Sequence, residues 1–137
     1  MKKNRILFAE DDTFCQKSVG RFLNISGYDV STVNTGGDAL RALRSHSYDL
    51  CIIDYHLPGM DAREVVETVR KEGVNTPFIV VTGDASSDTE RQARGLSPLF
   101  FFVKPFDLGD LRAVVDHAVG NASKHEHDSQ QLHAVNG

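Results

Sequence analysis

The chain has 137 residues, of which 40% are hydrophobic and 25% are charged, and its formal net charge is −4. This length suits one domain with one core, and the composition excludes disordered, fibrous and membrane-spanning classes. The negative charge disfavours direct nucleic-acid binding, which depends on clustered Lys and Arg.

The N-terminal apolar run and the spacing of the two cysteines indicate the cellular compartment of the protein. The first apolar run, residues 6–9, ends at Glu10 and is too short for an export signal. Cys15 and Cys51 stand far apart, without the spacing of a zinc site or a disulfide framework. We therefore expect a cytoplasmic protein that does not insert into a membrane.

Five short runs rich in β-branched and aromatic residues predict strands. In chain order they cover residues 6–9, 28–33, 50–53, 78–82 and 99–103. Segments with helical spacing follow each strand, over residues 13–25, 37–45, 62–69, 88–94 and 108–118. Gly27 is expected to end the first helix, and Asp107 is expected to cap the last.

The fourth predicted helix differs from the others. Ser87 and Glu90 suggest a capping box at its start, but Ala93 is almost its only apolar residue. We expect this helix to be the most weakly docked.

Alternating strands and helices, with nearly continuous apolar strands, predict an α/β fold with a parallel sheet covered on both faces. Right-handed crossovers favour a flavodoxin-like (βα)5 three-layer sandwich of strand order 2-1-3-4-5. We assign residues 1–119 to this domain. Residues 120–137 are polar and without periodicity, so we predict a mobile C-terminal tail.

Polar residues stand where the predicted strands end, at the edge where such sheets bind ligands. They are Glu10, Asp11, Asp12, Asp54, Thr82 and Lys104. Each alone is typical of a helix cap, a strand filler or a solvated loop. Grouped carboxylates, however, suit Mg²⁺, and a carboxylate beside a lysine can accept a phosphoryl group.

Four stretches in this order carry a resemblance to a known family: ILFAEDD, IIDYHLPGMD, FIVVTGD and FFVKPF. Across roughly residues 4–119 the chain resembles the receiver domains of two-component response regulators, of the single-domain type found in chemotaxis. The resemblance implies that Asp54 accepts a phosphoryl group from a phosphohistidine of a partner kinase or phosphotransfer protein.

The same resemblance implies a role for each neighbouring residue. Glu10, Asp11, Asp54 and the backbone carbonyl of His56 would bind Mg²⁺. Lys104 would contact the phosphoryl group, and its bond to the following proline would be cis.

The resemblance also implies a switch and an output face. Thr82 and Phe101 would be the switch residues. They would bias the face formed by the fourth helix, fifth strand and fifth helix, where an unidentified downstream protein would bind.

The sequence departs from the family pattern at several positions. Glu10 stands where Asp is usual, and Ala62 replaces a usual glycine, which disfavours a positive φ there. Phe101 lacks the hydroxyl of the common tyrosine.

The residues before the lysine differ as well. One hypothesis is that Leu99, Phe100 and Phe102 add apolar surface that binds a partner. We favour the alternative that they pack under the fourth helix.

His56 and Asp84 lie two positions after the acceptor and the threonine. By resemblance, they would tune the lifetime of the phosphoryl group. The alternative is that His56 is a solvated surface histidine.

The preferred function is a phosphorylation-controlled switch that is not an enzyme, because its only chemistry is performed on itself. With no effector domain after residue 119, we expect output in trans, from a free-standing relay, a regulator of a target, or an excised receiver of a longer kinase. The main alternative is a degenerate receiver that binds proteins independently of phosphorylation. A phosphatase is disfavoured, because His56 stands where a general acid would be needed.

Overall fold

The computed structural model describes residues 2–120 of the chain, so that the predicted tail, apart from Gly120, lies outside the described residues. Strands and helices alternate through the described part. The elements are β1 (Arg5–Ala9), α1 (Thr13–Ile25), β2 (Asp29–Val33), α2 (Gly36–Ser45), β3 (Leu50–Asp54), α3 (Ala62–Lys71), β4 (Phe78–Thr82), α4 (Ser87–Arg94), β5 (Phe100–Val103) and α5 (Leu108–Ala118).

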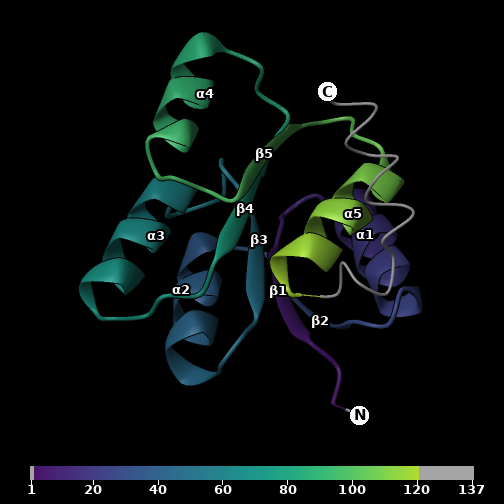
Figure 1. Cartoon of the computed structure of the whole chain (residues 1–137). Coiled ribbons are helices and arrows are strands. Elements are labelled where there is room, and N and C mark those ends of the chain that lie inside the picture. Colours follow the sequence, from purple (N-terminus) through teal and green to yellow (C-terminus); the bar gives the residue numbers. More distant parts are fainter. Residues whose placement is uncertain (1, 121–137) are drawn as a thin grey trace.

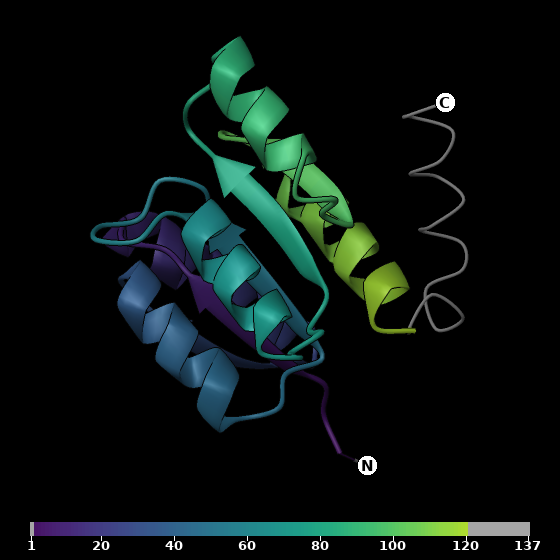
Figure 2. The same ribbon diagram turned by 90° about the vertical axis from the view of Figure 1, so that its left-hand side faces the viewer.

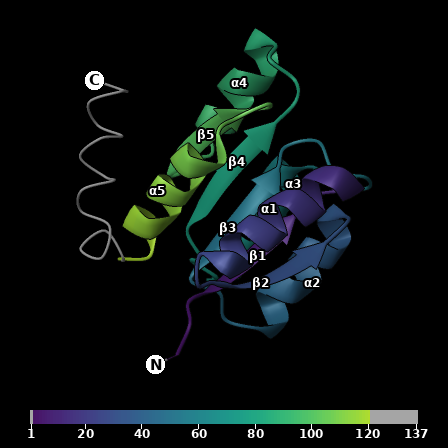
Figure 3. The same cartoon turned by 90° about the vertical axis from the view of Figure 1, so that its right-hand side faces the viewer.

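The five strands form one parallel sheet in the order β2-β1-β3-β4-β5, which confirms the predicted topology. Helices α2, α3 and α4 cover one face of the sheet, and α1 and α5 cover the other (Figure 1). Figure 2 shows the first group of helices and Figure 3 shows the second. The molecule is therefore the expected three-layer sandwich.

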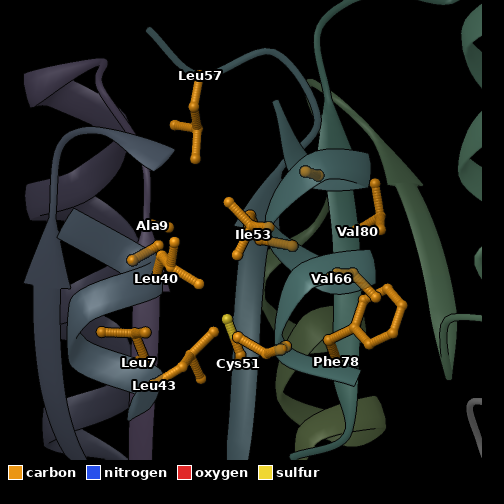
Figure 4. Packing of buried hydrophobic residues seen from close by; sticks show 14 of the residues in the cluster. Leu7, Ala9, Leu40, Leu43, Cys51, Ile53, Leu57, Val66, Phe78 and Val80 are labelled. Carbon is orange, nitrogen blue, oxygen red and sulfur yellow. The ribbon is translucent and has the colours of Figure 1, made fainter. Parts of the chain in front are cut away.

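A separate apolar cluster fills each space between the sheet and its helices. Side chains alternate across a strand, so Leu7 and Ala9 enter the cluster under α2 and α3, whereas Ile6 and Phe8 enter the one under α1 and α5. Figure 4 shows the first cluster, in which Ile53 of β3 lies among side chains of α2 and α3. All five residues of β3 are buried, and this holds its last residue, Asp54, firmly at the sheet edge.

The predicted helix ends are mostly confirmed. Helices α1 and α5 have the predicted bounds, and the Asp107 side chain accepts a hydrogen bond from the backbone N–H of Asp110. Gly27 follows α1 with a φ of 103°, a left-handed conformation that glycine adopts without steric penalty. No helix within residues 2–120 is long and apolar enough to cross a membrane.

Helix α4 begins one residue earlier than predicted, which corrects its cap. The N-cap is Ser86, whose side chain accepts from the Thr89 N–H at 3.3 Å, and Ser87 is already the first helical residue. Only Thr89 and Ala93 are buried in this helix, fewer than in any other of the described helices. Its predicted lack of apolar surface is confirmed, and its weak docking stays a prediction.

The favoured packing of the aromatic residues in β5 is wrong. Phe102 is buried against the α5 side of the sheet, where its ring lies 5.2 Å from that of Phe106. Phe100 points to the same side and is 40% exposed, and Leu99 is 52% exposed. Alternation along the strand sends Phe101, not Phe100 or Phe102, toward α4. A surface role for Leu99 and Phe100 stays a prediction, whereas Phe102 is core.

Candidate phosphoryl-acceptor site

The carboxyl ends of β1, β3 and β5 bring four of the predicted site residues together. The Lys104 ammonium donates to Asp54 Oδ2 at 2.6 Å and also to Glu10 Oε1. Carboxylate oxygens of Glu10, Asp11 and Asp54 all lie within 4.8 Å of one another. Glu10 and Asp54 are buried, whereas Asp11 is exposed. The site thus consists of two buried carboxylates and one exposed carboxylate, with Lys104 bonded to the two buried ones.

The register of the sheet explains why these side chains meet. Ala9 of β1 pairs with Ile53 of β3, so Glu10 and Asp54 follow paired residues at the same edge. Thr82 of β4 pairs with Val103 of β5, so Lys104 emerges beside them. The Lys104 N–H donates to the Thr82 carbonyl at 2.7 Å, and the Lys104–Pro105 bond is cis, as predicted.

The loop after Asp54 has a different turn residue from the one expected. The left-handed residue is Gly59, with a φ of 82°, while Ala62 is buried at the start of α3. The Ala62 N–H donates to the Tyr55 carbonyl at 3.0 Å and closes the loop. Alanine therefore fits this position, because no positive φ is required there.

Burial and charge shape the proton affinity of the cluster. Burial raises the pKa of Glu10, although the hydrogen bond from Lys104 opposes this effect. Burial alone would lower the pKa of Lys104, but its hydrogen bonds to Asp54 and Glu10 outweigh burial and raise it. With all four groups ionised, three carboxylates and one ammonium leave an excess of negative charge. The cluster is therefore suited to a further cation.

The two predicted switch residues lie on neighbouring strands. Thr82 is fully buried, and its hydroxyl accepts from the Asp84 N–H at 3.0 Å. Phe101 is half-buried, and the Arg94 guanidinium lies 5.3 Å from the centre of its ring. The aromatic ring thus contacts α4 directly.

The residue two positions after the acceptor is not a free surface histidine. His56 Nε2 lies 3.0 Å from Asp84 Oδ2 and 3.2 Å from Thr89 Oγ1. The Thr89 hydroxyl donates to Asp84 at 2.6 Å, and this bond holds the pKa of Asp84 well below its ordinary value. The His56 backbone N–H donates to Asp54 Oδ1 at 3.0 Å. His56 is therefore bonded both to the acceptor and to its surroundings.

Two residues near the site were missed from the sequence. Thr89 and Gln92 of α4 reach back to the residues that follow Asp54, since the Tyr55 hydroxyl donates to Gln92 Oε1 at 2.7 Å. Their spacing of three residues places both on one helix face next to Ala93. That spacing was the one feature of the sequence from which their shared helix face could have been predicted.

The comparisons with known proteins agree with this geometry. The family model for the response regulator receiver domain matches residues 6–116. The cell cycle transcriptional regulator CtrA of Caulobacter vibrioides is 29% identical over 120 residues, which cover 88% of this chain and 52% of that protein. The chain thus spans about half the length of the curated relatives it matches.

Solved structures show the same fold. A CheY-like receiver domain protein from Methanospirillum hungatei has a TM-score of 0.80 and 27% identity, covering 90% of this chain and 99% of the other. The receiver domain of a sensor histidine kinase from Pseudomonas aeruginosa, solved with magnesium in its active-site cleft, has a TM-score of 0.80 and 25% identity, covering 87% and 99%. This chain belongs to the family of receiver domains of two-component response regulators.

Proposed function

We propose that Asp54 accepts a phosphoryl group from a phosphohistidine and that the chain thereby acts as a phosphorylation-controlled switch. The observation that carries this proposal is the Lys104 ammonium, which bridges Asp54 and Glu10 at the ligand edge of the sheet. A lysine on a buried carboxylate can offset negative charge on an incoming phosphoryl group.

The transfer would exchange one bond to phosphorus for another. A carboxylate oxygen of Asp54 forms the new P–O bond, while the P–N bond breaks and the imidazole of the donor leaves with the electron pair. Lys104 turns from the Asp54 carboxylate to the transferring oxygens. Thr82 is the last residue of β4 at the same edge, and its hydroxyl donates to a phosphoryl oxygen.

The donor set of the site fits Mg²⁺. Glu10, Asp11 and Asp54 offer hard oxygen ligands within 4.8 Å of one another, and the His56 backbone carbonyl is the fourth candidate ligand. When bound there, Mg²⁺ would supply positive charge that offsets the charge of the transferring phosphoryl group. The excess of carboxylates over Lys104 supports this assignment.

Membership of the receiver family implies a kinase or phosphotransfer protein as phosphodonor and a protein partner downstream. We propose that Thr82 and Phe101 relay the state of Asp54 to the face formed by α4, β5 and α5. Support comes from Phe101, which contacts Arg94 of α4 from within β5. Direct nucleic-acid binding is disfavoured by the net charge of −4 over the whole chain.

The proposal is tested by incubating the protein with Mg²⁺ and a small phosphodonor such as acetyl phosphate. Intact-protein mass spectrometry should detect one added phosphoryl group, and the adduct should be lost when EDTA replaces Mg²⁺. Lys104→Met should slow formation of the adduct, whereas Lys71→Met, in an exposed position on α3, should not. A parent protein that never forms the adduct would instead fit a phosphorylation-independent binding module.

A further inference from the structure

Helix α4 gains little from apolar burial. Only two of its eight residues are buried, and one of these, Thr89, is polar. The neighbouring helix α3 buries Ala62, Val65, Val66 and Val69. Because apolar burial is roughly proportional to the area removed from water, α4 must depend on other contacts for much of its attachment.

The first such contact comes from the residue directly after Asp54. Tyr55 is 1% exposed, and its hydroxyl donates to Gln92 Oε1 in the second half of α4 at 2.7 Å. The Tyr55 backbone is itself held by β4, since its N–H donates to the Val81 carbonyl at 2.8 Å. Tyr55 thus links the sheet to helix α4.

The second contact comes from the next residue. His56 Nε2 and the Thr89 hydroxyl both lie within hydrogen-bond distance of Asp84 Oδ2, at 3.0 and 2.6 Å. A carboxylate only accepts, so both groups donate to it, and bonds to a charged acceptor are the stronger kind. The Asp84 carboxylate therefore joins the loop after β3 to the first half of α4.

We propose that Tyr55, His56, Asp84, Thr89 and Gln92 form a latch that holds α4 on the sheet and couples its opening to the state of Asp54. The structural basis of the coupling is the His56 N–H, which donates to Asp54 Oδ1 at 3.0 Å. A carboxyl that carries a phosphoryl group is a weaker acceptor than a free carboxylate. Phosphorylation would therefore weaken the hydrogen bond from the His56 N–H to Asp54 and loosen the latch there. The coupling, but not the latch itself, rests on the proposed phosphoryl acceptance.

Amide hydrogen exchange of the unphosphorylated protein tests the latch directly, because exchange reports local opening. Thr89→Val keeps the side-chain shape but removes the hydroxyl. The loss of one charge-assisted hydrogen bond should speed exchange of the α4 amides about tenfold, with α3 unchanged. Tyr55→Phe should speed it about fivefold.

Thr68→Val is the matched control. Its hydroxyl donates to the Glu64 carbonyl within α3 at 2.7 Å, so the chemical change is the same but does not involve α4. This variant should leave α4 exchange at the parent rate. Parent-like α4 exchange in both Thr89→Val and Tyr55→Phe would overturn the latch.

A double variant tests whether the residues act as one unit. His56 and Thr89 share the Asp84 carboxylate, so His56→Ala combined with Thr89→Val should open α4 by less than the product of the two single effects. Effects that multiply would show independent contacts and would contradict a shared latch.

The coupling is tested by repeating the exchange experiment with Mg²⁺ and acetyl phosphate, with Mg²⁺ alone as the reference. Where mass spectrometry detects the adduct, α4 exchange in the parent should rise, and it should rise less in Thr89→Val. An adduct without a change in α4 exchange would overturn the coupling. If no adduct forms, the proposed function fails, and the exchange rates of the unphosphorylated variants still decide the latch.

Discussion

Lys104 is the residue whose removal should most change the energetics of the site. Its ammonium is the shared partner of Glu10 and Asp54, and its side chain is only 23% exposed. Lys104→Met keeps most of the apolar stem and leaves both carboxylates without their cation. Removing one partner of a fully buried ion pair costs about 3–5 kcal/mol. Because Lys104 is partly exposed and water can replace some of its bonds, we expect a loss of about 2–3 kcal/mol.

The loss should depend on pH, and its sign follows from Glu10. Burial already places the folded-state pKa of Glu10 above its ordinary value of 4.5. A carboxyl whose pKa is raised by folding binds more protons in the folded than in the unfolded state, so its contribution lowers stability as pH rises. Without Lys104 this pKa rises further. The deficit of Lys104→Met should therefore be smallest in acid and should grow as pH rises above 4.5.

Urea unfolding in EDTA, followed by circular dichroism from pH 4.5 to 8, measures this effect. Lys17→Met, an exposed lysine on α1, is the matched control and should change the free energy of unfolding by less than about 0.5 kcal/mol. A Lys104→Met deficit below about 0.5 kcal/mol at pH 7, or one that grows toward acid, would show that Lys104 does not stabilise the buried carboxylates.

Three further predictions concern packing and reactivity. Gly36→Ala should destabilise the protein by about 2 kcal/mol or more, because the new Cβ would lie 2.0 Å from the Met60 carbonyl oxygen. The control Gly37→Ala, whose new Cβ has its nearest neighbour at 3.8 Å, should be neutral or stabilising. Equal unfolding midpoints of the two variants would contradict this. Ile53→Ala should cost about 2–5 kcal/mol in urea unfolding, and a loss under 1 kcal/mol would contradict the close packing behind Asp54. Burial raises the pKa of the Cys51 thiol to about 12. Iodoacetamide at pH 8 should therefore modify Cys51 only after the protein unfolds. Rapid labelling of Cys51 in the folded protein would contradict its burial.

The sequence pattern was sufficient to predict the arrangement of strands and helices. Apolar runs of strand length alternated with helical spacing. Crossover handedness then restricted the possible topologies, and the order common for a chain of this size is the one observed. The same logic brought Glu10, Asp11, Asp54 and Lys104 together, because the carboxyl ends of parallel strands share an edge.

The side-chain direction in β5 could not be read from the sequence. Four apolar residues in a row, FFFV, carry no alternation, so nothing indicated which of them faces α4. The direction depends on which helix covers each face of the sheet, and that is a property of the whole fold.

The polar attachment of α4 was hidden for a related reason. Periodicity detects apolar faces, and the buried face of α4 consists of Thr89 and Ala93, with Gln92 beside them. A polar side chain in a helix is normally exposed, so only its partners in three dimensions reveal its role. The loop after Asp54 was similar, since Gly59 rather than position 62 provides the left-handed turn.

The most direct test of the central claim is to locate the phosphoryl group on the chain. After incubation with Mg²⁺ and acetyl phosphate, borohydride reduction converts an acyl phosphate to an alcohol, and peptide mass spectrometry then identifies the modified residue. We expect modification at Asp54 alone in the parent and none in Asp54→Ala. Modification at another residue, or the same level of adduct in Asp54→Ala, would contradict this expectation.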